Sequence, residues 1–298
     1  MPLGVSGNRE SRSEMAQKTL SSPQLGYCGD QVRRDDPDRF LTSLFAPVDR
    51  RESLWAVLAF NLEVAKTRER VREPMLGQIR LQWWRDAVAE IFAGAPREHA
   101  VVAALAKATA ASGLSRTAME DLIDARETDL SPDPPADLAA LEAYAEQSAG
   151  PLLALAAQAL GTALPEDLCR RLAAPQALSG LLLAIPFRGL HGRVDLPADL
   201  MAKAGLIPEA VIDPSARVAV ADLARQIADR AEARLRAALA EAHELPKEAR
   251  PALLTLTLAK RNLARLSQAG FDPFNPILGQ RDGLLSARLW WTMSTGRF

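Results

Sequence analysis

The sequence has few residues of the kinds that build metal sites or disulfide scaffolds. Its two cysteines, Cys28 and Cys169, lie far apart, and its three histidines are scattered without the spacing of a zinc-binding motif. We therefore expect two reduced thiols. Lys and Arg number 36 against 37 Asp and Glu, a formal net charge of −1. This balance provides no overall field for nucleic acid, so we expect no nucleic-acid partner.

Long apolar runs are also missing. Pro and Gly interrupt the most apolar segments, 151–164 and 177–187, so none reaches the roughly 18 residues that a membrane-spanning helix needs. Residues 1–25 mix Arg, Ser, Gly and Glu without an apolar centre, which predicts a disordered tail and not a secretory signal. We therefore expect a cytoplasmic protein, and a peripheral position at the inner membrane stays open.

What the sequence does contain is Ala and Leu at helical spacing. Hydrophobic residues make up 48% of the chain and aromatic residues only 5%, a mixture that favours helix. No segment has the alternation typical of a β-strand. Asp36 before Pro37, and Ser115 after Gly113, are typical helix starts. We predict a single all-α domain over residues 26–298.

The most informative stretch is 49–92, which predicts two long helices joined at Pro74. Asp49 and Glu52 have the spacing of a capping box at the start of the first helix. Three of the five Trp residues occur here at helical spacing, which predicts core positions for Trp55, Trp83 and Trp84.

Two blocks of sequence resemble a known family. The pattern F-N-x-E at 60–63, followed by G-x-I-R-L-Q-W-W at 77–84, is similar to the squalene/phytoene synthase family, and especially to the branch of the mitochondrial complex I assembly factor 6 and its bacterial relatives. L-L-L-A-I-P-F at 181–187 and G-R-V-D-L-P-A-D-L at 192–200 also resemble this family. The resemblance implies the isoprenoid-synthase fold, a helical bundle around a central cavity.

The family's enzymes join two prenyl diphosphates head to head, and they use two aspartate-rich helical segments that hold Mg²⁺ across the cavity. Mg²⁺ requires oxygen ligands, and the departing diphosphate must be neutralised. The matching positions here are Ala65, Lys66 and Glu69 in the first segment and Ala184, Phe187 and Arg188 in the second. Glu69 alone carries a carboxylate, while Lys66 and Arg188 are cations. We therefore expect no catalytic residue, no metal and no cofactor; an active enzyme would need Mg²⁺.

The two cations at these positions have two interpretations. We expect Lys66 and Arg188 to pair with Glu63 or Glu69 and to fill the pocket, because buried cations need partners. The alternative is that they hold a diphosphate without metal. The resemblance also implies a set of candidate cavity or partner-surface residues: Asn61, Glu63, Gln78, Gln82 and Arg85.

Two further residue pairs attract attention. Asp195 and Asp199 have the D-x-x-x-D spacing, but Pro197 lies between them, so we expect Asp195 to cap a short helix at 198–204. Trp290 and Trp291 lie between arginines near the end of the chain. Such an aromatic pair suits a membrane surface or a protein partner.

Three alternative functions are consistent with these sequence features. The first is a non-catalytic assembly factor for respiratory complex I, with complex I subunits or other assembly factors as partners. The alternative is a prenyltransferase that condenses two prenyl diphosphates head to head. The second alternative is a protein that binds a prenyl diphosphate or another lipid in its cavity.

Overall fold

The computed structural model describes residues 25–71, 73–280 and 282–298, and over this part of the chain it contains helices and no β-strand, as predicted. The α-helices are α2 (Tyr27–Asp35), α3 (Pro37–Ser43), α4 (Val48–Ala65), α5 (Thr67–Arg70), α6 (Pro74–Phe92), α7 (Ala100–Ser112), α8 (Arg116–Asp124), α9 (Leu138–Ala159), α10 (Glu166–Leu190), α11 (Ala198–Lys203), α12 (Arg217–Ala242), α13 (Arg250–Gln268) and α14 (Leu285–Thr295). Five 3₁₀ turns connect them: η1 (Thr128–Leu130), η2 (Pro208–Ile212), η3 (Pro214–Ala216), η4 (Lys247–Ala249) and η5 (Pro276–Gly279). The expected tail at 1–25 lies, except for Leu25, outside the described residues.

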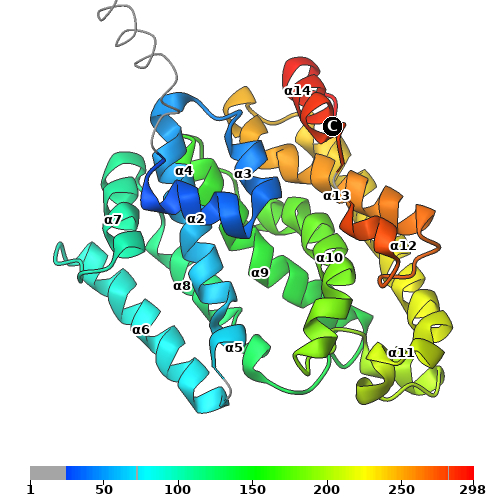
Figure 1. Cartoon of the computed structure of the whole chain (residues 1–298). Helices are drawn as coiled ribbons and strands as arrows, with labels where there is room; N and C mark the ends of the chain where they lie inside the picture. Colours follow the sequence, from blue (N-terminus) through cyan, green and yellow to red (C-terminus); the bar gives the residue numbers. More distant parts are fainter. Residues whose placement is uncertain (1–24, 72, 281) are drawn as a thin grey trace, which may run out of the picture.

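Helices α9 and α10 lie side by side in the middle of the bundle (Figure 1). On one side, α9 packs against α4 and α8, and α4 packs in turn against α2 and α7. On the other side, α10 packs against α12 and α13. Pro175 and Pro186 lie inside α10 without ending it, so the segment 181–187 of the family resemblance lies on one continuous helix, whereas 192–200 follows it.

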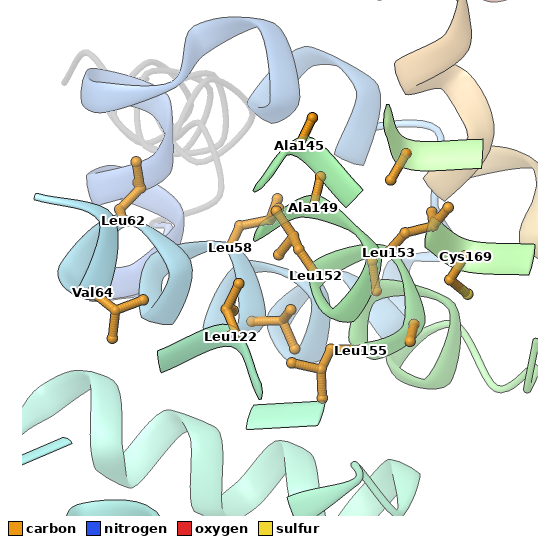
Figure 2. Close-up of a cluster of buried hydrophobic side chains, with 14 of the residues drawn as sticks. Leu58, Leu62, Val64, Leu122, Ala145, Ala149, Leu152, Leu153, Leu155 and Cys169 are labelled. Carbon is orange, nitrogen blue, oxygen red and sulfur yellow. The ribbon is translucent and has the colours of Figure 1, made fainter. Parts of the chain in front are cut away.

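One contiguous core of buried side chains joins these helices. Figure 2 shows part of it, with side chains from α4, α8, α9 and α10 in contact: Leu58, Leu122, Leu152, Leu155 and Cys169. Trp55 and Trp84 are buried in this core, as predicted, whereas Trp83 is only partly buried beneath the Arg97 guanidinium, 4.8 Å from the ring centre. Removal of this apolar surface from water is the main term that stabilises the bundle.

A second, smaller core lies between α13 and α14. It consists of Leu254 and Leu258 from α13 with Leu285 and Leu289 from α14. The partly buried side chains of Leu41, Phe45 and Met293 pack around it. Helix α14 therefore attaches to the bundle through a contact of its own.

The stretch 49–92 differs in two details from its prediction. Helix α4 ends at Ala65, and the short α5 precedes α6, so two breaks separate the long helices and not one. The predicted capping box is wrong: Pro47 occupies the N-cap position, α4 begins at Val48, and no side chain caps it. Asp49 therefore lies inside the first turn, where its carboxylate suits the helix dipole but is not the N-cap acceptor.

Helix α10 is, within the described part of the chain, the one helix that is long and apolar enough to cross a membrane by length and composition. Half of its most apolar 18-residue window is buried inside the bundle. Its contacts with α9, α12 and α13 are those of a central core helix.

Candidate functional site

A cavity of about 300 Å³ lies between α4, α9 and α10, where the fold predicts one. Its inner wall is made of apolar or small residues from the three helices: Leu62, Ala149, Leu152, Ala177, Gly180, Leu181 and Ala184. Its opening carries charged side chains: Lys66, Glu69, Arg126 and Arg188. A second hollow, of about 350 Å³, shares Ala65, Glu69 and Arg188 with it and reaches the end of α10. The two hollows therefore adjoin at the positions that the resemblance predicts to match the family's aspartate-rich segments.

The first of these positions lies at the break between α4 and α5. Ala65 is the last residue of α4, and Lys66 follows it outside helical geometry. The Lys66 Nζ lies 3.0 Å from a carboxylate oxygen of Asp35 on α2. The pKa of Asp35 is lowered, first by its hydrogen bond from Arg34 and further by that from Lys66. Glu69, on α5, is exposed and lines both hollows.

The second position lies on the last turns of α10. Ala184 faces the cavity, and Phe187 is half exposed at the second hollow. The Arg188 guanidinium lies 2.5 Å from Asp195 and 3.7 Å from Asp129. Lys66 and Arg188 are therefore both paired, but the expected partners, Glu63 and Glu69, were wrong.

Arg188 belongs to a buried network that we name the Arg/Asp cluster: Arg126, Asp129, Tyr144, Arg188, Arg193 and Asp195. The Tyr144 hydroxyl donates to Asp129 at 2.5 Å. Arg193 lies 2.8 Å from Asp129 and donates to Asp195 at 2.9 Å. Three guanidinium groups thus share two buried carboxylates, which leaves one excess positive charge at the cavity opening.

The network perturbs its own ionisable groups. Burial by itself would lower the pKa of Arg188, but Asp195, Tyr144 and Asp129 outweigh this effect and raise it. The pKa of Tyr144 is also raised, mainly by burial and then by the charge of Asp129. Both shifts keep the protons on Arg188 and Tyr144 at neutral pH.

Most of this cluster was not predicted from the sequence. Asp195 does not cap α11, whose N-cap is Pro197 without any side-chain hydrogen bond. The Asp195 side chain is instead buried between Arg188 and Arg193, because an ion pair with buried guanidinium groups satisfies it better than a free helix end. Arg126 and Asp129 were not predicted, although their i, i+3 spacing is a signal for a local ion pair. Asp199 pairs with Lys203 on the exposed face of α11.

Glu63 forms a separate buried site. It accepts hydrogen bonds from Gln31 at 2.7 Å, Arg70 at 2.5 Å and Arg80 at 2.6 Å. Burial by itself would raise the pKa of Glu63, but these donors, Arg70 first, outweigh burial and lower it. Because its oxygens are already occupied, Glu63 is not a partner for Lys66. It links α2, α4, α5 and α6.

The other candidate residues fall into two groups. Asn61 lines the cavity and accepts a hydrogen bond from Arg126 at 3.3 Å. Gln78 and Gln82 lie on the exposed face of α6, and Arg85 reaches from α6 to Asp124 and Glu127, at 2.6 Å from each. The structure therefore divides the predicted set between the cavity, the Glu63 site and the outer surface of α6.

The donors around the cavity do not fit a Mg²⁺ ion. Among the described residues, no three Asp, Glu, His or Cys side chains are grouped closely enough to hold a metal. At the matched positions the cations Lys66 and Arg188 accompany one carboxylate, Glu69. Asp129, which lines the second hollow, already accepts from Tyr144 and faces arginines. Mg²⁺ needs several oxygen ligands without cations between them.

Comparison with known proteins agrees with the fold and the motifs. A family model described as squalene/phytoene synthase matches residues 32–294. A Bos taurus relative, "NADH dehydrogenase (ubiquinone) complex I, assembly factor 6", is 30% identical over 269 residues, which cover 89% of this chain and 80% of the relative. A presqualene diphosphate synthase of Rhodopseudomonas palustris is 31% identical over 185 residues, 60% of this chain and 62% of that protein. The crystal structure of a dehydrosqualene synthase superposes with a TM-score of 0.78 at 17% identity, over 97% of this chain and 98% of the other.

Proposed function

Because the chain belongs to the squalene/phytoene synthase family, we propose that it serves as a non-catalytic assembly factor for respiratory complex I. It would bind complex I subunits or other assembly factors near the inner membrane. The observation that carries this proposal is the charge at the cavity opening, where Lys66 and Arg188 line the cavity. The resemblance predicts that these two residues match the aspartate-rich segments. The similarity to relatives named as complex I assembly factors supports it.

The ion pairs of these two cations also support a binding role. Lys66 is paired with Asp35, and Arg188 with Asp195. A cation that neutralises a departing diphosphate must be free to do so, and breaking a buried ion pair is costly. Because Lys66 and Arg188 each already have a carboxylate partner, they suit a stable scaffold better than a site for diphosphate ionisation.

The outer surface of α6 is the best candidate for the protein contact. Met75 and Ile79 are 69% and 59% exposed, and the neutral amides Gln78 and Gln82 lie beside them. Helix α6 lies at the edge of the bundle with this face uncovered (Figure 1). Apolar and amide side chains with few charges are typical of the centre of a protein interface.

The test is complementation in the source organism after deletion of its chromosomal copy. Assembled complex I is measured on native gels and by NADH:ubiquinone oxidoreductase activity. Glu69→Ala should restore assembly fully, because this carboxylate has no catalytic duty in the proposed role. Ile79→Asp should restore it poorly, because a charge enters the centre of the proposed contact.

The matched control is Val218→Asp, which places the same charge at another exposed apolar residue, 76% exposed on α12. It should complement like the wild-type chain. The proposal fails if Glu69→Ala abolishes assembly while Ile79→Asp leaves it intact.

The shape and charge of the cavity favour a second candidate, a carrier of prenyl diphosphates or other anionic lipids. The inner wall is apolar, with Leu152 and Leu181, and the opening holds an excess of cations. Such a site could accept an isoprenoid chain inward and its phosphates at the opening. Thermal-shift titration with farnesyl diphosphate, with and without Mg²⁺, tests this role, since a ligand that binds the folded state raises the unfolding midpoint.

The three outcomes separate the remaining functions. A shift without Mg²⁺ supports the carrier. A shift that requires Mg²⁺, together with a condensed product, supports the head-to-head prenyltransferase and overturns the non-catalytic proposal. The absence of a shift in both conditions leaves the assembly role without a lipid ligand.

A further inference from the structure

The charge of the chain is unevenly distributed. Residues 250–298 contain seven Lys or Arg against two Asp and no Glu, although the whole chain has a net charge of −1. Helices α13 and α14 hold no carboxylate at all. This end of the sequence therefore forms a basic region on an otherwise slightly acidic protein.

Helix α14 has an apolar inner face and an outer face that carries two aromatic side chains. Leu285 and Leu289 point into the small core beneath the helix, whereas Trp290 and Trp291 are 62% and 57% exposed. Leu284, just before the helix, is 62% exposed. Large apolar side chains at this exposure remain in contact with water unless something covers them.

A groove of about 690 Å³ runs between α13 and α14 beside these residues. Lys260, Arg288 and Arg297 line it together with Leu284 and Trp291. Arg288 has an ion pair with Asp282 at 3.2 Å. The Lys260 Nζ donates to the terminal oxygen of Phe298 at 3.3 Å. Within the described part of the chain, no Asp or Glu side chain forms an ion pair with Lys260 or Arg297. The groove thus combines an excess of cationic side chains with exposed apolar side chains.

We propose that this basic groove and the outer face of α14 dock the protein on an anionic lipid bilayer. Trp side chains prefer the membrane–water interface, where the indole ring is apolar and its N–H remains solvated. Lys and Arg beside them would contact lipid phosphates, and each cation near such a surface strengthens binding about fivefold. The docking does not depend on the proposed assembly role.

The geometry also gives the docked protein an orientation. Helix α14 lies at one end of the bundle, and α5, which lines the cavity opening, lies at the other (Figure 1). With α14 on the bilayer, the cavity opening would face away from the lipid.

The test is flotation of the full chain with vesicles of phosphatidylcholine alone or with about a third phosphatidylglycerol. The wild-type chain should float with the anionic vesicles and not with the neutral ones, and added salt should weaken its binding. Lys260→Gln/Arg297→Gln should bind about 25-fold more weakly, from two cations at about fivefold each. Arg116→Gln/Arg225→Gln, which removes two exposed cations from α8 and α12, should bind like the wild type.

Fluorescence locates the contact. Brominated phosphatidylcholine in the anionic vesicles should quench the wild-type emission, and Trp290→Phe/Trp291→Phe should float normally but lose the quenching. Flotation with neutral vesicles to the same extent, unchanged binding of the Lys260/Arg297 variant, or persistent quenching without the two Trp residues would each overturn the proposal.

The outcome is separate from that of the assembly assay. If the wild-type chain floats normally, while Glu69→Ala abolishes complex I assembly and Ile79→Asp leaves it intact, the assembly role alone is overturned. If the wild type binds no vesicle, yet the Lys260/Arg297 variant fails to assemble complex I, the groove binds an acidic protein surface and the lipid proposal is wrong.

Discussion

Replacement of Asp129 by Asn tests whether the Arg/Asp cluster stabilises the fold. Asp129 is 3% exposed, accepts from Tyr144 at 2.5 Å, and lies 2.8 Å from Arg193. The substitution keeps the shape of the side chain and removes its charge. Three arginines would then share the single carboxylate of Asp195.

The magnitude follows from this imbalance. Removal of one partner from a buried ion pair costs about 3–5 kcal/mol, because the other charge stays buried without compensation. The three guanidinium groups retain 13–19% of their side-chain exposure, and Asp195 remains, so we place the loss near the lower limit, at about 3 kcal/mol. For a chain of this size, this loss corresponds to a fall in the unfolding temperature of about 5–10 °C.

The assay is equilibrium unfolding in urea, followed by tryptophan fluorescence. Glu69→Gln is the control, since an exposed side chain at the same opening should change stability by less than about 0.5 kcal/mol. Asp129→Asn/Arg193→Met should be less destabilised than Asp129→Asn alone, because one uncompensated charge is gone. If Asp129→Asn is as stable as the wild type, or more stable, the cluster is not a stabilising element. That result would be better explained if the cluster binds an anion and its arginines repel one another in the absence of the anion.

Three further predictions concern single side chains. Tyr144→Phe removes a hydrogen bond to a buried carboxylate and should lower the free energy of unfolding by about 1–3 kcal/mol in the same urea assay. Gly150→Ala should cost about 1–3 kcal/mol, because its Cβ would lie 3.0 Å from a backbone atom of α10, whereas Gly180→Ala, with open space around it, should be neutral or stabilising. Burial raises the pKa of Cys28 to about 11 and of Cys169 to about 12. Both should resist a thiol reagent at pH 8 until the protein unfolds, and stability should fall as pH rises above about 9, where thiols ionise first in the unfolded chain.

The helices were predictable wherever the signal was local. Asp36 caps α3 by accepting from the Arg39 amide at 3.0 Å, and Ser115 caps α8 by accepting from the Ala118 amide at 3.2 Å. Gly113 ends α7 in the left-handed region, with φ of 65°. Each of these signals involves residues within one helical turn of each other. A short sequence pattern therefore suffices to predict where the helix begins or ends. The capping box at Asp49 failed because Pro47 started the helix earlier.

The sequence identified several residues that line the cavity, but it did not identify the ion-pair partners of those residues. Lys66, Glu69 and Arg188, which the resemblance singled out, all line the cavity. The partners of the two cations, Asp35 and Asp195, were not predicted, since ion pairs between different helices depend on how those helices pack. Asp195 looked like a helix cap in its local sequence, and burial among arginines decided otherwise.

The contact between the two ends of the chain bears on how the protein is made. Arg261 on α13 donates to Asp38 on α3 at 3.1 Å, across 223 residues, and Leu41 and Phe45 pack against the small core formed by α13 and α14. A ribosome must therefore release nearly the whole polypeptide before the apolar side of α3 can be covered. Contacts so distant in sequence form slowly. Until they form, the nascent chain exposes apolar surface that promotes aggregation. Because of this topology, we expect the nascent chain to need chaperone protection during synthesis.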